Sequence, residues 1–457
     1  MLNSLRMFLL LMLALAALAP ATSLAVPSFA RQTGMDCAAC HTSFPELTPF
    51  GREFKLNGYT LGERQLLPLA AMMQFSATHV DKQSTAGNDY MAKQDAPQFD
   101  GLSLFVAGKI TDYAGAFIQW TYENLDHFNA DGRIGNHSHV DNVDIRVVGH
   151  HDFMEKNLTY GLSLNNNPTV QDVWNSTPAW GFPFNGSKLT GLGSAAGFTP
   201  KASSGSTLIN GGLAQVAAGV GGYFYWDRHL YGELSFYGNA DKIFRPLSAG
   251  AWYNDTAHTA LAGRNNPYWR LAWNEDWGSH SLMVGTYGMQ ADIYTDATNR
   301  SGPTDRYTDT AFDAQYQYLS DPHIFTVQTT YIHEKQELMS TFANGGSSNA
   351  TNKLNEFKLK GSYLYNRKYG ATLAYFQSTG SADDLLYVNP NPFAYGYSKP
   401  DNRGYMVELD YNPWTNVRVA LQYTAYTKMD GAKNNYDGTG RNASDNNILF
   451  LNSWFAF

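Results

Sequence analysis

The sequence has little cysteine, little charge and, beyond residue 25, no long apolar run. Two cysteines in an exported chain would ordinarily form one disulfide, but their context below indicates otherwise. The absence of any further stretch of about eighteen apolar residues excludes a bundle of membrane-spanning helices. The 32 Lys and Arg against 40 Asp and Glu give a net charge of −8. Without a clustered basic face, the chain shows no sign of binding nucleic acid.

The N-terminus has the pattern of a secretory signal. Met1–Arg6 carries one positive charge, and Met7–Ala19 is nearly pure apolar sequence. Small residues, Ser23 and Ala25, then stand at the −3 and −1 positions of a cleavage site, so we expect residues 1–25 to be removed. The alternative, a retained membrane helix, is disfavoured because the apolar run is too short to cross about 30 Å of hydrocarbon.

Both cysteines fall in one motif, Cys37-Ala38-Ala39-Cys40-His41. C-x-x-C-H is the attachment signature of heme c, because two thiols at this spacing reach the two vinyl groups of one porphyrin. The adjacent imidazole then ligates the iron from the proximal side. A thioredoxin-like redox pair would need a βαβ context that is absent, and a simple disulfide would leave His41 unexplained. The motif therefore predicts one covalent heme c on Cys37 and Cys40, with His41 as ligand.

The distal side of the iron needs a Met or a second His. Met72, Met73 and His79 lie beyond the motif in Leu69–Val80, a segment with strand alternation. Met72 falls on the polar face, which should line a barrel lumen, and Met73 on the apolar face. Met72 is therefore the candidate distal ligand. The alternative is that it merely packs beneath the heme segment.

From about Pro68 onward, segments of roughly ten residues alternate apolar and polar, separated in turn by short and long connections. Five hairpins are expected around short turns, at Thr111–Ala114, Trp226–His229, Ser320–Pro322, Asn366–Lys368 and Asn412–Thr415. The long connections are rich in Gly, Ser and Asn, and span Asp81–Asp100, Asn165–Gly212, Asn239–Asn265, Gln336–Lys353, Ser378–Asn402 and Lys428–Asn446. This asymmetry is typical of bacterial outer-membrane barrels, and the count of about sixteen strands places both termini on the periplasmic side.

Charged residues alternate with apolar ones in these segments, as in Asn142–Val148, Asn355–Tyr365 and Val417–Tyr426. Because charged side chains that face lipid are costly, we expect these side chains to face the barrel interior. The C-terminal strand, which ends at Phe457, resembles the assembly signal of outer-membrane proteins. A soluble β-sandwich also alternates, but it does not require long and short connections in turn. We therefore predict an all-β, transmembrane antiparallel β-barrel of about 16 strands over residues 68–457.

The segment between the signal and the barrel, residues 26–67, is too short for a cytochrome with its own core. We expect this monoheme cytochrome c segment to plug the lumen and use the barrel wall as its own. Its position decides the function. A heme inside the apolar band, which is about 25 Å tall, leaves electron-transfer gaps on the order of 10 Å. A heme outside the band would make the protein a tethered periplasmic carrier.

A resemblance is carried by VPSFARQTG, CAACH, PEL, FGREFK and GY within Val26–Tyr59, and by NNNPTVQDVWNSTPAWGFPF at Asn165–Phe184. These strings resemble the fused outer-membrane monoheme cytochrome c–porins that act as iron(II) oxidases. The resemblance implies that extracellular Fe(II) is the electron donor and a periplasmic c-type cytochrome the acceptor. It also implies that Cys37 and Cys40 bind the heme and His41 ligates its iron.

The substrate does not follow from residue spacing. Carboxylates suited to hard metal ions occur in the long connections, at Asp126, Asp131, Asp383, Asp384 and Asp445, although solvated loop acids are common. No catalytic constellation beyond the heme stands out. Two alternatives remain open, a diffusion porin with a structural heme and a conduit for another extracellular donor or acceptor.

Overall fold

The computed structural model describes residues 27–82, 95–128, 134–187, 206–250, 259–387, 399–414, 416–438 and 440–457. The predicted signal, residues 1–25, lies outside these ranges. In the described residues, sixteen antiparallel strands form one closed barrel in which every strand pairs with its sequence neighbours and β1 pairs with β16. The predicted fold class, an all-β antiparallel barrel of about sixteen strands, is confirmed.

The strands are β1 Leu69–Val80, β2 Gln98–Thr111, β3 Ala114–Phe128, β4 Ile134–Phe153, β5 Lys156–Asn165, β6 Ala217–Trp226, β7 Leu230–Asn239, β8 Asn266–Trp277, β9 His280–Tyr294, β10 Thr304–Ser320, β11 His323–Glu337, β12 Thr351–Tyr365, β13 Tyr369–Gly380, β14 Asn402–Trp414, β15 Val417–Lys428 and β16 Ile448–Ala456. The short helices are α2 Pro27–Thr33, α3 Cys37–Cys40, α4 Pro49–Leu56, α5 Met339–Ala343, η1 Pro178–Trp180, η2 Leu208–Gly212, η3 Lys242–Leu247 and η4 Ala443–Asn446. None of these described helices is long and apolar enough to cross a membrane.

Alternation along the strands separates a polar interior from an apolar exterior. In β11, Phe325 and Val327 are exposed on the outside, whereas Gln328 and Glu334 are buried on the inside. In Asn142–Val148, where charged side chains were predicted to face inward, Arg146 is completely buried. An apolar outer surface of this kind suits contact with lipid. The polar side chains of the inner face can be buried only where other polar groups of the protein pair with them.

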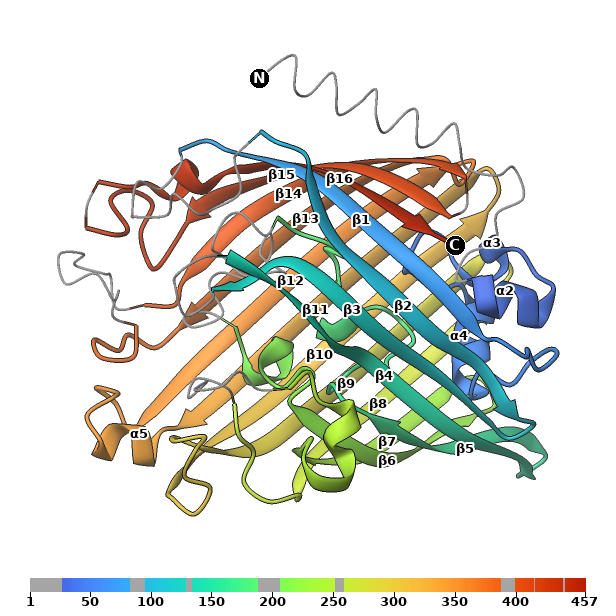
Figure 1. Ribbon diagram of the computed structural model, residues 1–457, viewed down its shortest axis with the longest axis horizontal. Helices are drawn as coiled ribbons and strands as arrows, with labels where there is room; N and C mark the ends of the chain where they lie inside the picture. The colour runs from blue at the N-terminus through green and yellow to red at the C-terminus, as the bar shows by residue number, and fades with distance from the viewer. Residues whose placement is uncertain are drawn as a thin grey trace.

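All five predicted hairpins form, although Thr415 of the last turn lies outside the described residues. The short turns gather at one end of the barrel and the long connections at the other. Figure 1 shows α2, α3 and α4 at the same end as the C-terminus, and α5 among the long connections at the opposite end. The pairing of β1 with β16 closes the barrel along the length of both strands, and at the short-turn end the backbones of Ala71 and Phe457 exchange hydrogen bonds of 2.7 and 2.9 Å.

One long connection differs from expectation. The segment after β5, predicted only as a long polar connection, is almost entirely buried from Asn165 to Thr177. Its side chains bond to inward-facing residues of the strands, including Asp172 with Arg270. The first part of this connection therefore folds back into the lumen. A barrel of this width would otherwise hold water there, so the polar strand faces find hydrogen-bond partners in this segment.

Candidate functional site in the barrel lumen

The CAACH motif forms a single helical turn. The N–H of His41 donates a 2.8 Å hydrogen bond to the carbonyl of Cys37, which closes α3 with His41 as its C-cap. Cys37 is buried and Cys40 half-buried, and in the described residues the two thiols are not joined by a disulfide. The turn thus presents both sulfurs and the imidazole from one short, fixed piece of backbone.

The segment after the motif holds this turn in place. Thr48 begins α4 as its N-cap, and its hydroxyl donates to the carbonyl of Ala39 at 2.6 Å. A Cβ built on Gly51 would lie 2.2 Å from the carbonyl oxygen of Cys40. Only glycine therefore allows α4 to approach α3 this closely. Gly51 belongs to the FGREFK string that carries the resemblance, and Thr48 lies between that string and PEL.

The barrel wall also holds the motif directly. The guanidinium of Arg367, in the turn between β12 and β13, donates to the carbonyls of Ala38 and His41 at 3.3 and 3.2 Å. Lys360 of β12 forms an ion pair with Glu46. These contacts tie the N-terminal segment to residues more than 300 positions away in the chain.

Arg52 anchors α4 to the inner wall on the opposite side of the segment. Its guanidinium donates to Gln317 at 2.8 Å and to Ser281 at 2.5 Å, and pairs with Asp276 at 3.3 Å. The Arg52 side chain is only 4% exposed, so these partners replace nearly all of its hydration. The expectation that this segment uses the barrel wall as its own is consistent with these contacts.

The buried connection after β5 meets the N-terminal segment inside the lumen. The side-chain oxygen of Asn175 accepts from the N–H of Leu47 at 3.0 Å. The ammonium of Lys55 donates to the carbonyls of Val170 and Asp172 at 2.6 and 2.9 Å. Both stretches that carried the resemblance are thus brought together, although about 110 residues separate them along the chain.

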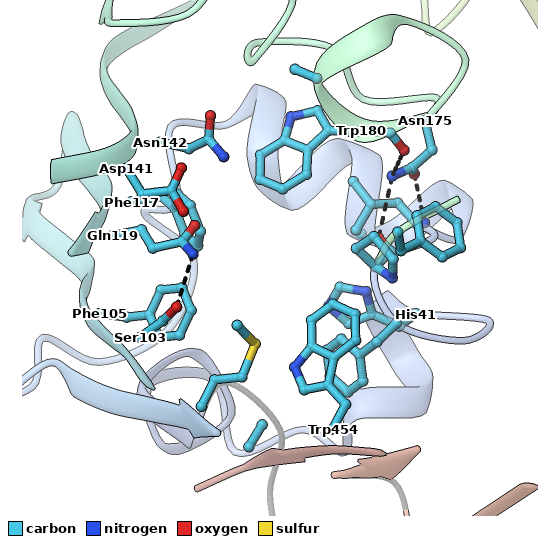
Figure 2. Close-up of a pocket in the computed structure, with 18 of the residues that line it drawn as sticks. His41, Ser103, Phe105, Phe117, Gln119, Asp141, Asn142, Asn175, Trp180 and Trp454 are labelled. Carbon is cyan, nitrogen blue, oxygen red and sulfur yellow. Dashed lines mark hydrogen bonds between the residues drawn. The ribbon is translucent and has the colours of Figure 1, made fainter. Parts of the chain in front are cut away.

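Between these stretches and the wall lies a cavity of about 440 Å³, within the range of small-molecule and cofactor sites. Cys37, Cys40, His41 and Met72 all line it. Its aromatic lining residues are Phe29, Phe44, Phe54, Tyr59, Phe105, Phe117, Trp180, Phe182, Phe184 and Trp454. Figure 2 shows His41 and Trp454 on one side, facing Phe105 and Gln119 across the open space.

The chemistry of this cavity fits a heme. The ring of His41 lies against Phe44 in a tilted arrangement, with the ring centroids 4.6 Å apart, and burial lowers the pKa of His41 to about 4. The imidazole is therefore neutral at ordinary pH, as an iron ligand must be. Burial also raises the pKa of Cys40 to about 11. The Nδ1 atom of His41 is buried, and a hydrogen bond with the backbone of Pro45 partly offsets the effect of burial on the pKa. Aromatic rings and the two thiols line the cavity near His41, and polar side chains line other parts of it.

Met72 lies on the lumen side of β1, as its alternation predicted, and is buried among Phe105 and other apolar residues of the cavity wall. The other distal candidates lie elsewhere. His79 shares the outward face of Met73 by alternation and contacts Asp95 at 3.0 Å. Met72 is thus the thioether that shares the cavity with His41. Whether it binds iron stays a prediction.

The loop carboxylates whose side chains the structure describes, Asp383, Asp384 and Asp445, do not form a common site. Asp383 was expected among the solvated acids of the long connections, but it is buried. Its carboxylate accepts hydrogen bonds from Ser347 and Asn352. Asp445 pairs with Lys82 at 3.2 Å. Asp384 is exposed, Asp131 lies outside the described residues, and the side chain of Asp126 is not described.

Sequence reasoning missed the polar wall of the cavity. Gln119, Asp141 and Asn142 line it opposite His41 (Figure 2). Two adjacent residues cannot both face inward in a regular strand, and a bulge in β4 brings this about. The only signal in the sequence is the break in alternation at Val140–Val143, which strand periodicity alone cannot place.

No protein-family model and no curated protein matches this chain. Solved structures similar to it are outer-membrane porins and channels. OmpT of Vibrio cholerae is 11% identical, with 85% of this chain and 96% of that chain covered and a TM-score of 0.42. The DcaP channel of Acinetobacter baumannii is 11% identical, with 85% of this chain and 96% of that chain covered and a TM-score of 0.43. OmpF of Salmonella typhi is 12% identical, with 85% of this chain and 97% of that chain covered and a TM-score of 0.43. At these values the likeness is one of barrel fold alone.

Proposed function

We propose that this chain is an outer-membrane cytochrome–porin, an iron(II) oxidase that takes electrons from extracellular Fe(II) and passes them to a periplasmic c-type cytochrome. One heme c, attached through Cys37 and Cys40 with His41 as proximal ligand, would supply a centre that takes up and releases one electron. The observation that carries the proposal is the cavity inside the barrel that these three residues line together with Met72.

The placement of the motif supports transfer across the membrane. The motif lies at the short-turn end, which in outer-membrane barrels is periplasmic. The cavity continues from the motif to Lys358, which lies in the middle of β12. A redox centre in this cavity would stand within the height of the barrel wall and shorten the distance for an electron from either surface.

The chain's own residues would exclude water and fix the centre. Arg367 and Thr48 hold the backbone of the motif, and aromatic residues line the cavity beside it. Rigid first contacts of this kind limit the structural change that accompanies gain or loss of an electron.

The test is anaerobic addition of Fe(II) to the purified ferric protein, followed by the visible bands of reduced heme. The expected result is reduction by Fe(II) in the wild type and no heme bands in the Cys37→Ala/Cys40→Ala variant. In proteoliposomes, external Fe(II) should also reduce an enclosed soluble cytochrome c. Absence of heme from the purified protein, or of reduction at every pH tried, would overturn the proposal.

The alternative of a diffusion porin with a structural heme is disfavoured by the occupied lumen. Arg52 and Lys55 bond the N-terminal segment to the wall and to the buried connection at once. Liposome swelling with small sugars distinguishes the two functions, because an occupied lumen should give swelling far below that of an open porin. Comparison of reduction rates with several donors distinguishes Fe(II) from another donor or acceptor.

A further inference from the structure

A bulge in β4 changes which side chains face the lumen. Opposite Gln119 of β3, β4 presents two residues, Asp141 and Asn142, in place of one. Both line the cavity. Since one extra residue shifts the alternation by one position, even-numbered side chains such as Arg146 face the lumen on the short-turn side of the bulge. On the long-loop side, odd-numbered side chains face it instead.

On the long-loop side of the bulge, the odd-numbered residues of β4 include residue types that commonly bind metal ions. His137 and His139 precede Asp141 at alternate positions of β4, and their rings stack with centroids 4.9 Å apart. Directly opposite them on β3 stand Glu123, paired with His137, and Thr121, paired with His139. Directly paired residues of antiparallel strands share a face, and Glu123 and Thr121 line the cavity. The two imidazoles therefore face the lumen next to the part of the cavity that Thr121, Glu123 and Asp141 line.

Two imidazoles and a carboxylate with open positions are the ligand set that Fe(II) takes in non-heme proteins. In the described residues, no three His, Cys, Asp or Glu side chains already stand in a position to hold a metal ion. The set is therefore not a preformed site for a resident metal. A substrate ion that must leave after reaction needs a weaker site, and rotation of the half-buried His137 and His139 side chains is fast enough to form one.

We propose that His137, His139 and Asp141, with Glu123 opposite, form a transient binding site for a divalent transition-metal ion of the Fe(II) class. The inference rests on the proposed function, in which such an ion is the electron donor. Asp141 lies on the cavity wall that faces His41 (Figure 2), so the ion would share one cavity with the CAACH motif. Each bound Fe(II) would become Fe(III) by giving one electron to the ferric heme, which would become ferrous. No covalent bond of the protein would form or break in this step.

The direct test is binding of Co(II), a redox-stable probe, to the oxidised heme-loaded protein, measured by its visible absorption and by calorimetry. The His137→Ala/His139→Ala variant should bind Co(II) at least tenfold more weakly than the wild type. His150→Ala/His151→Ala is the matched control, because it removes two histidines from the short-turn end of the same strand. Equal Co(II) affinity in the wild type and the His137→Ala/His139→Ala variant would overturn the inference.

Heme reduction separates this inference from the proposed function. At sub-saturating Fe(II), the His137→Ala/His139→Ala variant should be reduced about tenfold more slowly, with reduction by dithionite unchanged. An unchanged rate with Fe(II) would overturn the site as the donor position. If Fe(II) fails to reduce even the wild type while Co(II) binding still depends on the two histidines, the proposed function is wrong and the metal site stands.

Discussion

The backbone N–H of Thr48 donates a 2.9 Å hydrogen bond to the carbonyl of Cys40, and this bond joins the CAACH motif to the first turn of α4. The Thr48 hydroxyl accepts from the N–H of Gly51 at 3.2 Å in the same turn. The position of the second thiol therefore depends on a residue eight positions away, and the close approach at Gly51 is what makes the bond possible.

Replacement of Gly51 by alanine should prevent α4 from packing on α3, because the new Cβ would stand 2.2 Å from backbone oxygen that cannot give way. We expect a heme-to-protein ratio several-fold below wild type, measured by absorbance after denaturation, with barrel folding judged by heat-modifiable migration. Gly361→Ala is the control, since its Cβ meets nothing within 4 Å. A normal heme content in Gly51→Ala would show that the two helices need not touch.

Met72 is expected to set the potential of the iron. A Met ligand raises the reduction potential, so Met72→Ala should lower it by on the order of 0.1 V, within the roughly 0.8 V range that axial ligands set. Spectroelectrochemical titration measures this change. Met73→Ala, which alters the neighbouring outward-facing residue, should leave the potential unchanged. If both variants match the wild type, Met72 only fills space in the wall.

The barrel was predictable because its rules are local. Period-2 alternation fixed the inward faces of Arg146 and Lys360, and turn-forming residues fixed the hairpins. The heme c predicted from the CAACH motif rests on five consecutive residues and stays a prediction. The candidate site was not predictable, because it depends on long-range pairing. The bulge at Asp141 exists only in relation to Gln119, and the contact of Lys55 with Val170 joins segments that nothing in the sequence connects.

Arg52 should contribute most to the attachment of the N-terminal segment to the wall. Arg52→Met leaves Gln317 and Ser281 without a donor in a buried place, which we expect to weaken docking by roughly 3 kcal/mol. Faster protease cleavage between the motif and β1, with the barrel intact, is the measurement. Arg306→Met removes an exposed pair with Asp292 and should change the cleavage rate little. Equal rates in the two variants would contradict this role.

Lys55 should make docking of the segment depend on pH. Burial lowers the pKa of Lys55 from 10.5 to about 8, although Asp144 at 3.8 Å opposes the shift. In a detached segment Lys55 would be solvated and would titrate near 10.5. Between about pH 8 and 10.5 the detached state therefore holds more protons than the docked state, so raising the pH favours docking.

Below about pH 8 the ammonium is charged in both states, and its contribution does not change with pH. The gain between pH 8 and 10.5 is on the order of 3 kcal/mol at most, since one pKa unit corresponds to about 1.4 kcal/mol. Protease cleavage of the segment should slow over this range relative to Lys55→Met, in which this titration is absent and the other groups still titrate. A wild type that instead releases the segment faster than Lys55→Met as pH rises would mean that the ammonium charge holds the segment in place through Val170 and Asp172.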